Sequence, residues 1–145
     1  MTFQRIDHIG IIVKDLPAAT AFFLDFGFEV LGEAKMQGDL LEKLLGLEGV
    51  QTEFVMIALP GGGARLELIK FLAPPDEIGI QQLPVHAPGI RHIAFAVEDL
   101  EAIVARLKAK GMEVFSEILN YENVYKLCYC RGPEGIILDL AEEIK

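Results

Sequence analysis

Four residues of this chain have side chains that commonly bind divalent metal ions, and they occur as two matched pairs. His8 is followed later by Glu67, and His92 is followed by Asp139. Two imidazoles with two carboxylates form an N2O2 ligand set that suits Zn, Ni, Co, Mn or Fe(II). The sequence therefore predicts a divalent metal site made of these four residues.

The pairs belong to an internal repeat. IDHIGIIVKDL matches IRHIAFAVEDL, so that His92 follows His8 by 84 residues, and at the same spacing FGFEV matches KGMEV. RLELI, which contains Glu67, matches ILDLA, which contains Asp139. Each copy therefore begins with a histidine and ends with a carboxylate, as expected for a duplicated half-site.

Each copy has the pattern of a βαβββ module. Apolar alternation predicts a strand over residues 6–13, and Asp15 and Gly27 are suited to begin and end the helix that follows. Asp99 and Gly111 frame a second helix in the same way. Further strands are expected at 28–33, 52–59 and 64–71, and at 112–118, 124–130 and 135–141. The predicted fold class is α+β: two tandem βαβββ modules that form a curved mixed sheet, a half-barrel, with the helices on its outer face.

The chain is predicted to be a single domain over residues 1–145, because neither module alone is large enough to bury a good core. The first module spans 1–72 and the second spans 90–145. The segment 73–89 contains four prolines and no periodicity, which is typical of a linker. The sequences PGGG and RGPEG predict a hairpin between the last two strands of each module.

The largest difference between the copies is an insertion at 34–51. Its leucines and glycines predict a short amphipathic helix that ends at Gly46 or Gly49. One interpretation is that this helix covers a sheet edge, and the other is that it forms a lid or wall over a pocket.

Composition excludes several partners. The formal net charge of −9 argues against nucleic acid, which requires a basic surface, and no apolar run approaches the roughly 20 residues that span a bilayer. We expect a cytoplasmic protein. Cys128 and Cys130 lie two apart in one expected strand, so they are interpreted as reduced apolar residues. His86 is interpreted as a loop histidine, with substrate contact as the minor alternative.

Strand alternation also predicts which side chains face the site. Gly10 shares a face with His8, and Glu67 and Asp139 each lie between leucines, so both carboxylates should face away from the helices. Arg65 shares the face of Glu67 and could hold a substrate carboxylate or pair with a neighbouring acid. The candidates for substrate binding are Phe54, Met56, Arg65, Tyr121, Tyr125 and Tyr129.

HIGIIVKDL, LELI, PGIRHIAFAVEDL and RGPEGIILDLAEEI resemble the vicinal oxygen chelate superfamily over nearly the whole chain. That superfamily includes glyoxalase I, methylmalonyl-CoA epimerase, extradiol dioxygenases, fosfomycin resistance enzymes and bleomycin-binding proteins, and the pattern is nearest to the first two. The resemblance places the family's four ligands on His8, Glu67, His92 and Asp139, where the fourth is normally Glu. It also implies a small-molecule substrate with vicinal oxygens and a homodimer.

The function that the resemblance favours is a metal-dependent isomerase, lyase or epimerase that transfers a proton next to a carbonyl, while the metal stabilises an enediolate. Glu67 and Asp139 are the candidate catalytic residues. One alternative is an Fe(II)-dependent ring-cleaving dioxygenase that uses His8, His92 and Asp139. Others are a metal-free small-molecule-binding protein of the bleomycin-resistance kind and a transferase that adds a thiol.

Overall fold

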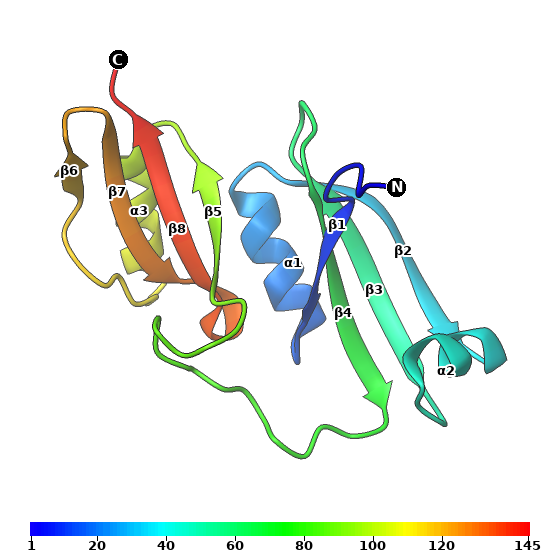
Figure 1. Cartoon of the computed structure of the whole chain (residues 1–145). Coiled ribbons are helices and arrows are strands. Elements are labelled where there is room, and N and C mark those ends of the chain that lie inside the picture. The colour runs from blue at the N-terminus through cyan, green and yellow to red at the C-terminus, as the bar shows by residue number, and fades with distance from the viewer. The chain divides into compact units, whose positions relative to one another are not determined.

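The structure, a computed structural model, describes residues 1–145 as two compact units, residues 1–79 and 80–145 (Figure 1). The boundary between the units falls inside the segment 73–89 that the sequence marks as a linker. Each unit contains one complete module. The single domain over 1–145 stays a prediction.

The first unit contains a four-stranded mixed sheet. Its elements are β1 (His8–Ile12), α1 (Leu16–Asp25), β2 (Glu29–Gln37), α2 (Asp39–Leu45), β3 (Gln51–Ala58) and β4 (Arg65–Ala73). The strand order is β1-β4-β3-β2, in which β1 is parallel to β4 and the other neighbours are antiparallel. The predicted hairpin through PGGG is therefore the β3–β4 connection.

The second unit repeats this topology. Its elements are β5 (His92–Ala96), α3 (Leu100–Ala109), β6 (Leu119–Tyr121), β7 (Tyr125–Arg131), a single 3-10 turn at Pro133–Gly135, and β8 (Ile137–Glu143). The strand order is β5-β8-β7-β6, again with one parallel pair, β5 and β8. The predicted α+β class with two βαβββ modules is confirmed, and each module forms its own sheet.

The helix α1 covers one face of the first sheet. The Asp15 carboxylate accepts a hydrogen bond of 3.0 Å from the backbone N–H of Ala18, which satisfies one of the free donors at the helix start. The buried side of α1 includes Phe22 and Phe23, which pack above β3 and β4, where Leu68 is fully buried. Burying a Phe or Leu side chain stabilises a fold by about 1.5–3 kcal/mol.

The helix α3 has the same role in the second unit. Asp99 caps its start, and the Glu142 carboxylate of β8 accepts a hydrogen bond of 2.9 Å from the N–H of Leu100, which ties the helix to the sheet. Beneath the helix lie the free thiols of Cys128 and Cys130, both buried, as predicted. Burial raises the pKa of the Cys130 thiol from 9.0 to about 12, because an apolar core disfavours the thiolate.

The prediction of a strand at 112–118 is wrong. Only Val114 forms an isolated bridge, with Cys130, and the next strand, β6, starts at 119. Two backbone bonds of 2.9 Å join this segment to β7, from Arg131 N–H to the Glu113 carbonyl and from Phe115 N–H to the Tyr129 carbonyl. The Ser116 hydroxyl then bonds to the carbonyl of Glu117, and local bonds of this kind compete with sheet pairing.

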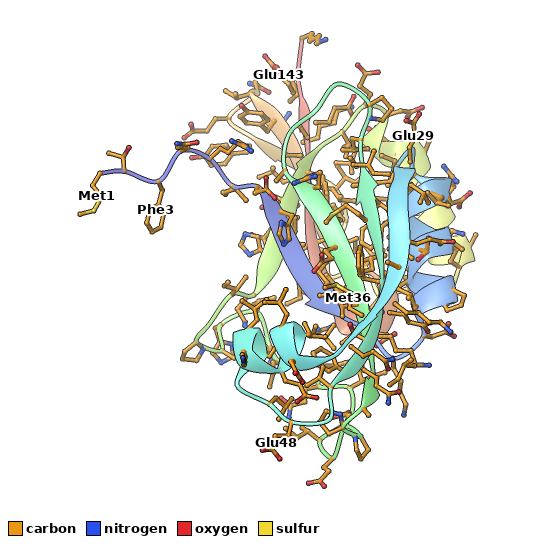
Figure 2. All side chains as sticks on the ribbon, turned by 90° about the vertical axis from the view of Figure 1, so that its right-hand side faces the viewer. Met1, Phe3, Glu29, Met36, Glu48 and Glu143 are labelled. Atoms are coloured by element: carbon orange, nitrogen blue, oxygen red, sulfur yellow. The ribbon has the colours of Figure 1, made fainter.

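The insertion is divided between a strand and a helix. β2 runs on to residue 37, past the predicted end at 33, and α2 follows it (Figure 2). The helix ends at Gly46, whose φ of 65° and ψ of 35° are the left-handed conformation that glycine adopts without strain. α2 lies against β2, the edge strand, while its Leu40 and Leu44 are 79% and 75% exposed. None of the helices has the length and apolar character needed to cross a membrane.

Candidate functional site

The first pair of predicted ligands lies on neighbouring strands, β1 and β4. His8 is level with Arg65, and Gly10 is level with Glu67. On β4 the leucines on either side of Glu67 are buried on the helix side, so Glu67 lies on the opposite face, as alternation predicted. Gly10 has no side chain, which leaves the space beside the Glu67 carboxylate open.

The second pair has the same register in the other unit. His92 is level with Ile137, and Ala94 is level with Asp139. Leu138 and Leu140 are buried beneath α3, so Asp139 also lies on the face away from its helix. Both units therefore place a carboxylate on the central strand beside a residue with little or no side chain on the edge strand. Residues that match in the sequence repeat therefore occupy matching positions in the two sheets.

The contacts of Asp139 show what this arrangement can bind. Its Oδ2 atom lies 3.9 Å from Nε2 of His92, which is too long for a hydrogen bond. Its Oδ1 atom is buried and has no hydrogen-bond partner. A buried carboxylate oxygen without a partner is destabilising unless it is paired with a cation or a donor.

A divalent metal ion fits these atoms. Bonds from zinc to histidine nitrogen and carboxylate oxygen are roughly 2.0–2.2 Å long, so two ligand atoms of one ion lie at most about 4.3 Å apart. The separation of 3.9 Å between His92 Nε2 and Asp139 Oδ2 is below that limit. The unpartnered Oδ1 supplies a second oxygen donor on the same carboxylate.

Tyr129 adds a phenol group to the second pair. It is directly opposite Asp139 in the β7–β8 ladder, and its ring centroid lies 5.3 Å from that of His92, edge to face. Burial raises the pKa of Tyr129, and the charge of Asp139 and a hydrogen bond to that carboxylate raise it further. The corresponding neighbour of Glu67 in the first unit is Met56, so the two carboxylates have chemically different surroundings.

His8 is held by Asp7, a residue that the sequence analysis did not single out. The Nδ1–H group of His8 donates a hydrogen bond of 2.7 Å to Oδ2 of Asp7, which leaves Nε2 as the free acceptor. A metal-binding histidine usually donates its second ring N–H to a carboxylate in this way. Hydrogen bonds from His8 and then Arg65 hold the pKa of Asp7 below its usual value. The repeat offered no signal, because Arg91 stands at the equivalent position in the second copy.

Three of the remaining candidates, Arg65, Phe54 and Met56, lie on the Glu67 face of the first sheet. Arg65 donates from Nη2 to Oδ2 of Asp7 over 2.5 Å, so of its two predicted roles the structure shows pairing with a neighbouring acid. Met56 is level with Glu67 and Phe54 with Ile69, and both alternate with buried residues of β3, which places them on the Glu67 face. His86 lies in the segment before β5, outside any helix or strand.

All three tyrosines of the chain lie on the Asp139 face of the second sheet. Tyr121 is paired with Tyr125, and Tyr125 is level with Glu143, four pairs along from Tyr129 and Asp139. Neither unit by itself gathers three or more His, Cys, Asp or Glu side chains that could hold an ion. Each unit contains one histidine and one carboxylate of the four predicted ligands.

The family model of the Glyoxalase/Bleomycin resistance protein/Dioxygenase superfamily matches residues 5–140. The chain belongs to this superfamily. This confirms the resemblance seen in the sequence. The superfamily includes glyoxalase I enzymes and also binding proteins without enzymatic activity.

The similar proteins cover the chain from end to end. A crystal structure of a glyoxalase family protein from Bacillus cereus has 38% sequence identity and a TM-score of 0.95, covering 100% of this chain and 97% of that one. The uncharacterized protein YwkD of Bacillus subtilis is 32% identical over 145 residues, 99% of this chain and 100% of its own length. The uncharacterized protein YaeR of Escherichia coli K12 is 27% identical over 142 residues, 97% of each chain.

Proposed function

We propose that this member of the superfamily is a divalent-metal-dependent enzyme of the glyoxalase or epimerase kind. It would transfer a proton at the carbon next to a carbonyl in a small substrate with vicinal oxygens. The observation that supports this most directly is the carboxylate of Asp139, with one buried oxygen lacking a partner and the other 3.9 Å from the His92 nitrogen.

The proposed ligands are His8, Glu67, His92 and Asp139. Bound there, a divalent ion would supply a Lewis acid that polarises the carbonyl oxygen of the substrate. Asp7 fixes the ring of His8 so that Nε2 is available, and Tyr129 contacts the carboxylate and imidazole of the other pair. These contacts support a ligand set that is oriented before the ion binds.

We assign the proton transfer to Glu67. Asp139 is one methylene shorter and is engaged by Tyr129, whereas the Glu67 carboxylate takes part in no hydrogen bond or ion pair and lies level with Gly10. In this assignment Glu67 accepts the proton from the carbon next to the carbonyl and returns it to the substrate. A carboxylate with open space on its own sheet face is suited to that movement.

Metal content tests the ligand set. Protein loaded with Zn, Ni, Co, Mn or Fe(II) and then desalted should retain an equivalent of ion, measured by mass spectrometry of the elements. His92→Ala and Asp139→Asn should lower retention, while His86→Ala, which removes the exposed loop histidine, should leave it unchanged. Retention that is the same in all four proteins would overturn the assignment.

The reaction is tested by hydrogen exchange. Hydroxyketones, 2-oxoaldehyde thiol adducts and 2-methyl thioesters would be incubated with the loaded enzyme in D2O and followed by proton NMR. The expected result is loss of the signal from the carbon next to the carbonyl, abolished in Glu67→Gln even at metal concentrations that restore full loading. Oxygen uptake with catechols by the Fe(II)-loaded protein, without such exchange, would favour the dioxygenase alternative.

The homodimer that the resemblance implies is part of the proposal. Light scattering would give the mass in solution against 16.0 kDa for one chain. Mixing His8→Ala with His92→Ala chains would then show whether one chain supplies both pairs of ligands. Metal binding returns on mixing only when the two pairs come from different chains, because each variant retains the pair that the other lacks.

A further inference from the structure

We propose that the pocket at the end of β5 and β8 in the second unit binds the non-reacting part of the substrate, and that this part is an organic cation with a planar apolar body. The position of the reacting carbon near Asp139 rests on the proposed function. The choice of a cation rests on the pocket alone, so the two can be tested separately.

Three alanines form the floor of the pocket. Ala94 is level with Asp139, and Ala96 on β5 is level with Ala141 on β8. They line one side of an open pocket of about 1170 Å³ at the end of the β5–β8 pair, and the helix side contributes residues such as Phe95 and Glu142. Pockets for small molecules commonly have volumes of about 300–1,000 Å³, so the space is sufficient for a whole ligand. Ala94 lines the pocket and is also the neighbour of Asp139, so the pocket reaches the proposed metal ligands.

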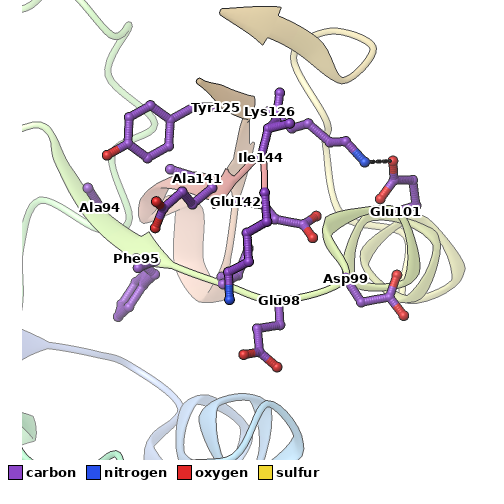
Figure 3. Close-up of a pocket in the computed structure, with 14 residues that line it drawn as sticks. Ala94, Phe95, Glu98, Asp99, Glu101, Tyr125, Lys126, Ala141, Glu142 and Ile144 are labelled. Carbon is purple, nitrogen blue, oxygen red and sulfur yellow. Dashed lines mark hydrogen bonds and ion pairs between the residues drawn. The ribbon is translucent and has the colours of Figure 1, made fainter. Parts of the chain in front are cut away.

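Tyr125 forms an aromatic wall above this floor (Figure 3). It precedes Tyr129, the partner of Asp139, by four residues on the same face of β7, and it remains 40% exposed. An exposed tyrosine ring next to small apolar residues offers a flat surface for a planar group, and the face of the ring also attracts cations.

The charged residues around the pocket favour a ligand with a positive charge. Five carboxylates line it (Glu98, Asp99, Glu101, Glu142 and Glu143), against two lysines (Lys126 and Lys145). The ammonium group of Lys126 is paired with Glu101 at 2.9 Å. Asp99 and Glu142 accept hydrogen bonds from backbone N–H groups of α3. The carboxylates of Glu98 and Glu143 form no hydrogen bond or ion pair, and so they are available to a ligand.

Glu143 is level with Tyr125, so a carboxylate and an aromatic ring lie side by side at this end of the pocket. An ammonium or amidinium group there would contact both. Anionic carriers such as glutathione or CoA would instead meet uncompensated negative charge. A strand rises about 3.3 Å per residue, so the four residues from Asp139 to Glu143 correspond to about 13 Å between the reacting end and the cationic end of the ligand.

Two small probes of nearly equal shape test the sign of the charge. 2-Phenylethylamine carries a cation and 3-phenylpropionate an anion, and each would be titrated into metal-free, nitrogen-15-labelled protein while amide signals are followed. We expect saturable shifts at Ala94, Ala96 and Ala141 with the amine, and at least tenfold weaker binding of the carboxylate. Raising the salt concentration should weaken amine binding.

Single substitutions distinguish the contribution of the Tyr125 ring from that of the Glu143 charge. Glu143→Gln should weaken amine binding about tenfold, and Tyr125→Ala should weaken it as well, whereas Tyr125→Phe should retain it because the ring is kept. Glu33→Gln, an exposed acid on β2 of the first unit, is the matched control and should bind as the wild type does. Two outcomes overturn the proposal: the carboxylate binds as tightly as the amine, or the shifts fall outside the pocket.

The same titration on Asp139→Asn distinguishes this proposal from the proposed function. That variant should lose metal and keep the amine. Amine binding without metal retention in the wild type would refute the metal-dependent function alone, and metal retention without amine binding would refute the cation pocket alone.

Discussion

The hydrogen bond between His8 and Asp7 gives the sharpest prediction about the first pair of ligands. Replacing Asp7 with Asn keeps the size of the side chain and removes its charge. The imidazole then loses the carboxylate that selects the Nδ1–H tautomer, and part of the population carries its proton on Nε2, the atom proposed to bind metal. We expect weaker metal binding without loss of the fold.

The geometry sets the size of this effect. Removing the partner of a metal-binding histidine commonly lowers metal affinity by about 10–100-fold. The 2.7 Å contact has the length of a charge-assisted bond, but the side chains of His8 and Asp7 are 40% and 45% exposed, so water can replace part of it. We therefore expect the lower end of the range, about a tenfold loss.

Two measurements follow the change. Competition with a chromophoric chelator gives the metal affinity, and nitrogen-15 NMR of the imidazole reports which ring nitrogen of His8 carries the proton in the metal-free protein. Arg5→Gln is the control, because Arg5 also pairs with Asp7, at 3.2 Å, but does not contact His8. The control should bind metal within about twofold of the wild type. Unchanged metal affinity or an unchanged tautomer in Asp7→Asn would refute the reasoning.

Three further predictions concern packing and pH. Gly10→Ala should fold normally, since the added Cβ would lie 3.7 Å from Ile69, whereas Gly10→Val should fill the space beside Glu67 and lower metal retention without a large fall in melting temperature. Leu68→Ala should destabilise the fold by about 2–5 kcal/mol in urea titrations, because Leu68 is fully buried. Leu72→Ala should cost clearly less, because Leu72 lies near the end of the same strand and is 44% exposed. Folding raises the pKa of the Cys130 thiol from 9.0 to about 12. The folded state therefore has its full stability below pH 9 and loses stability as the pH rises toward 12, because only the unfolded chain ionises readily there. The melting temperature should fall over that interval, and it should fall less steeply in Cys130→Ala.

The strand that carries each proposed carboxylate could be predicted because its alternation is unambiguous. Leucines on both sides of Glu67 and of Asp139 fix which face is buried, and the repeat fixes the partner strand. The helices were predictable for a similar reason, since Asp15 and Asp99 both act as caps in the structure.

Two features could not be predicted from these patterns. The segment 112–118 has apolar alternation, but the local hydrogen bond of Ser116 interrupts its pairing with β7. β2 runs past residue 33 although every residue in it is exposed, so it shows no contrast between a buried and an exposed face. In both cases the deciding interaction lies outside the hydrophobic pattern.

Contacts between side chains could not be predicted from the sequence either. The bond from His8 to Asp7 depends on a side-chain rotamer that precedes the strand, where alternation does not apply. The contact of Tyr129 with His92 depends on the register of β7 on β8, which is set by the turn at Pro133–Gly135. Proximity in the sheet, and not residue type, distinguishes these side chains from other aspartates and tyrosines.

The strand order of the first sheet has a consequence for engineering this chain. His92 follows His8 by 84 residues, but Asp139 follows Glu67 by only 72, so the first module is longer, and most of the extra length lies between β2 and β3. Those strands form the edge farthest from β1, while the proposed ligands lie on β1 and β4. Loops of varied length, reporter peptides or affinity tags can therefore be introduced around α2 without altering the register that aligns Gly10 with Glu67.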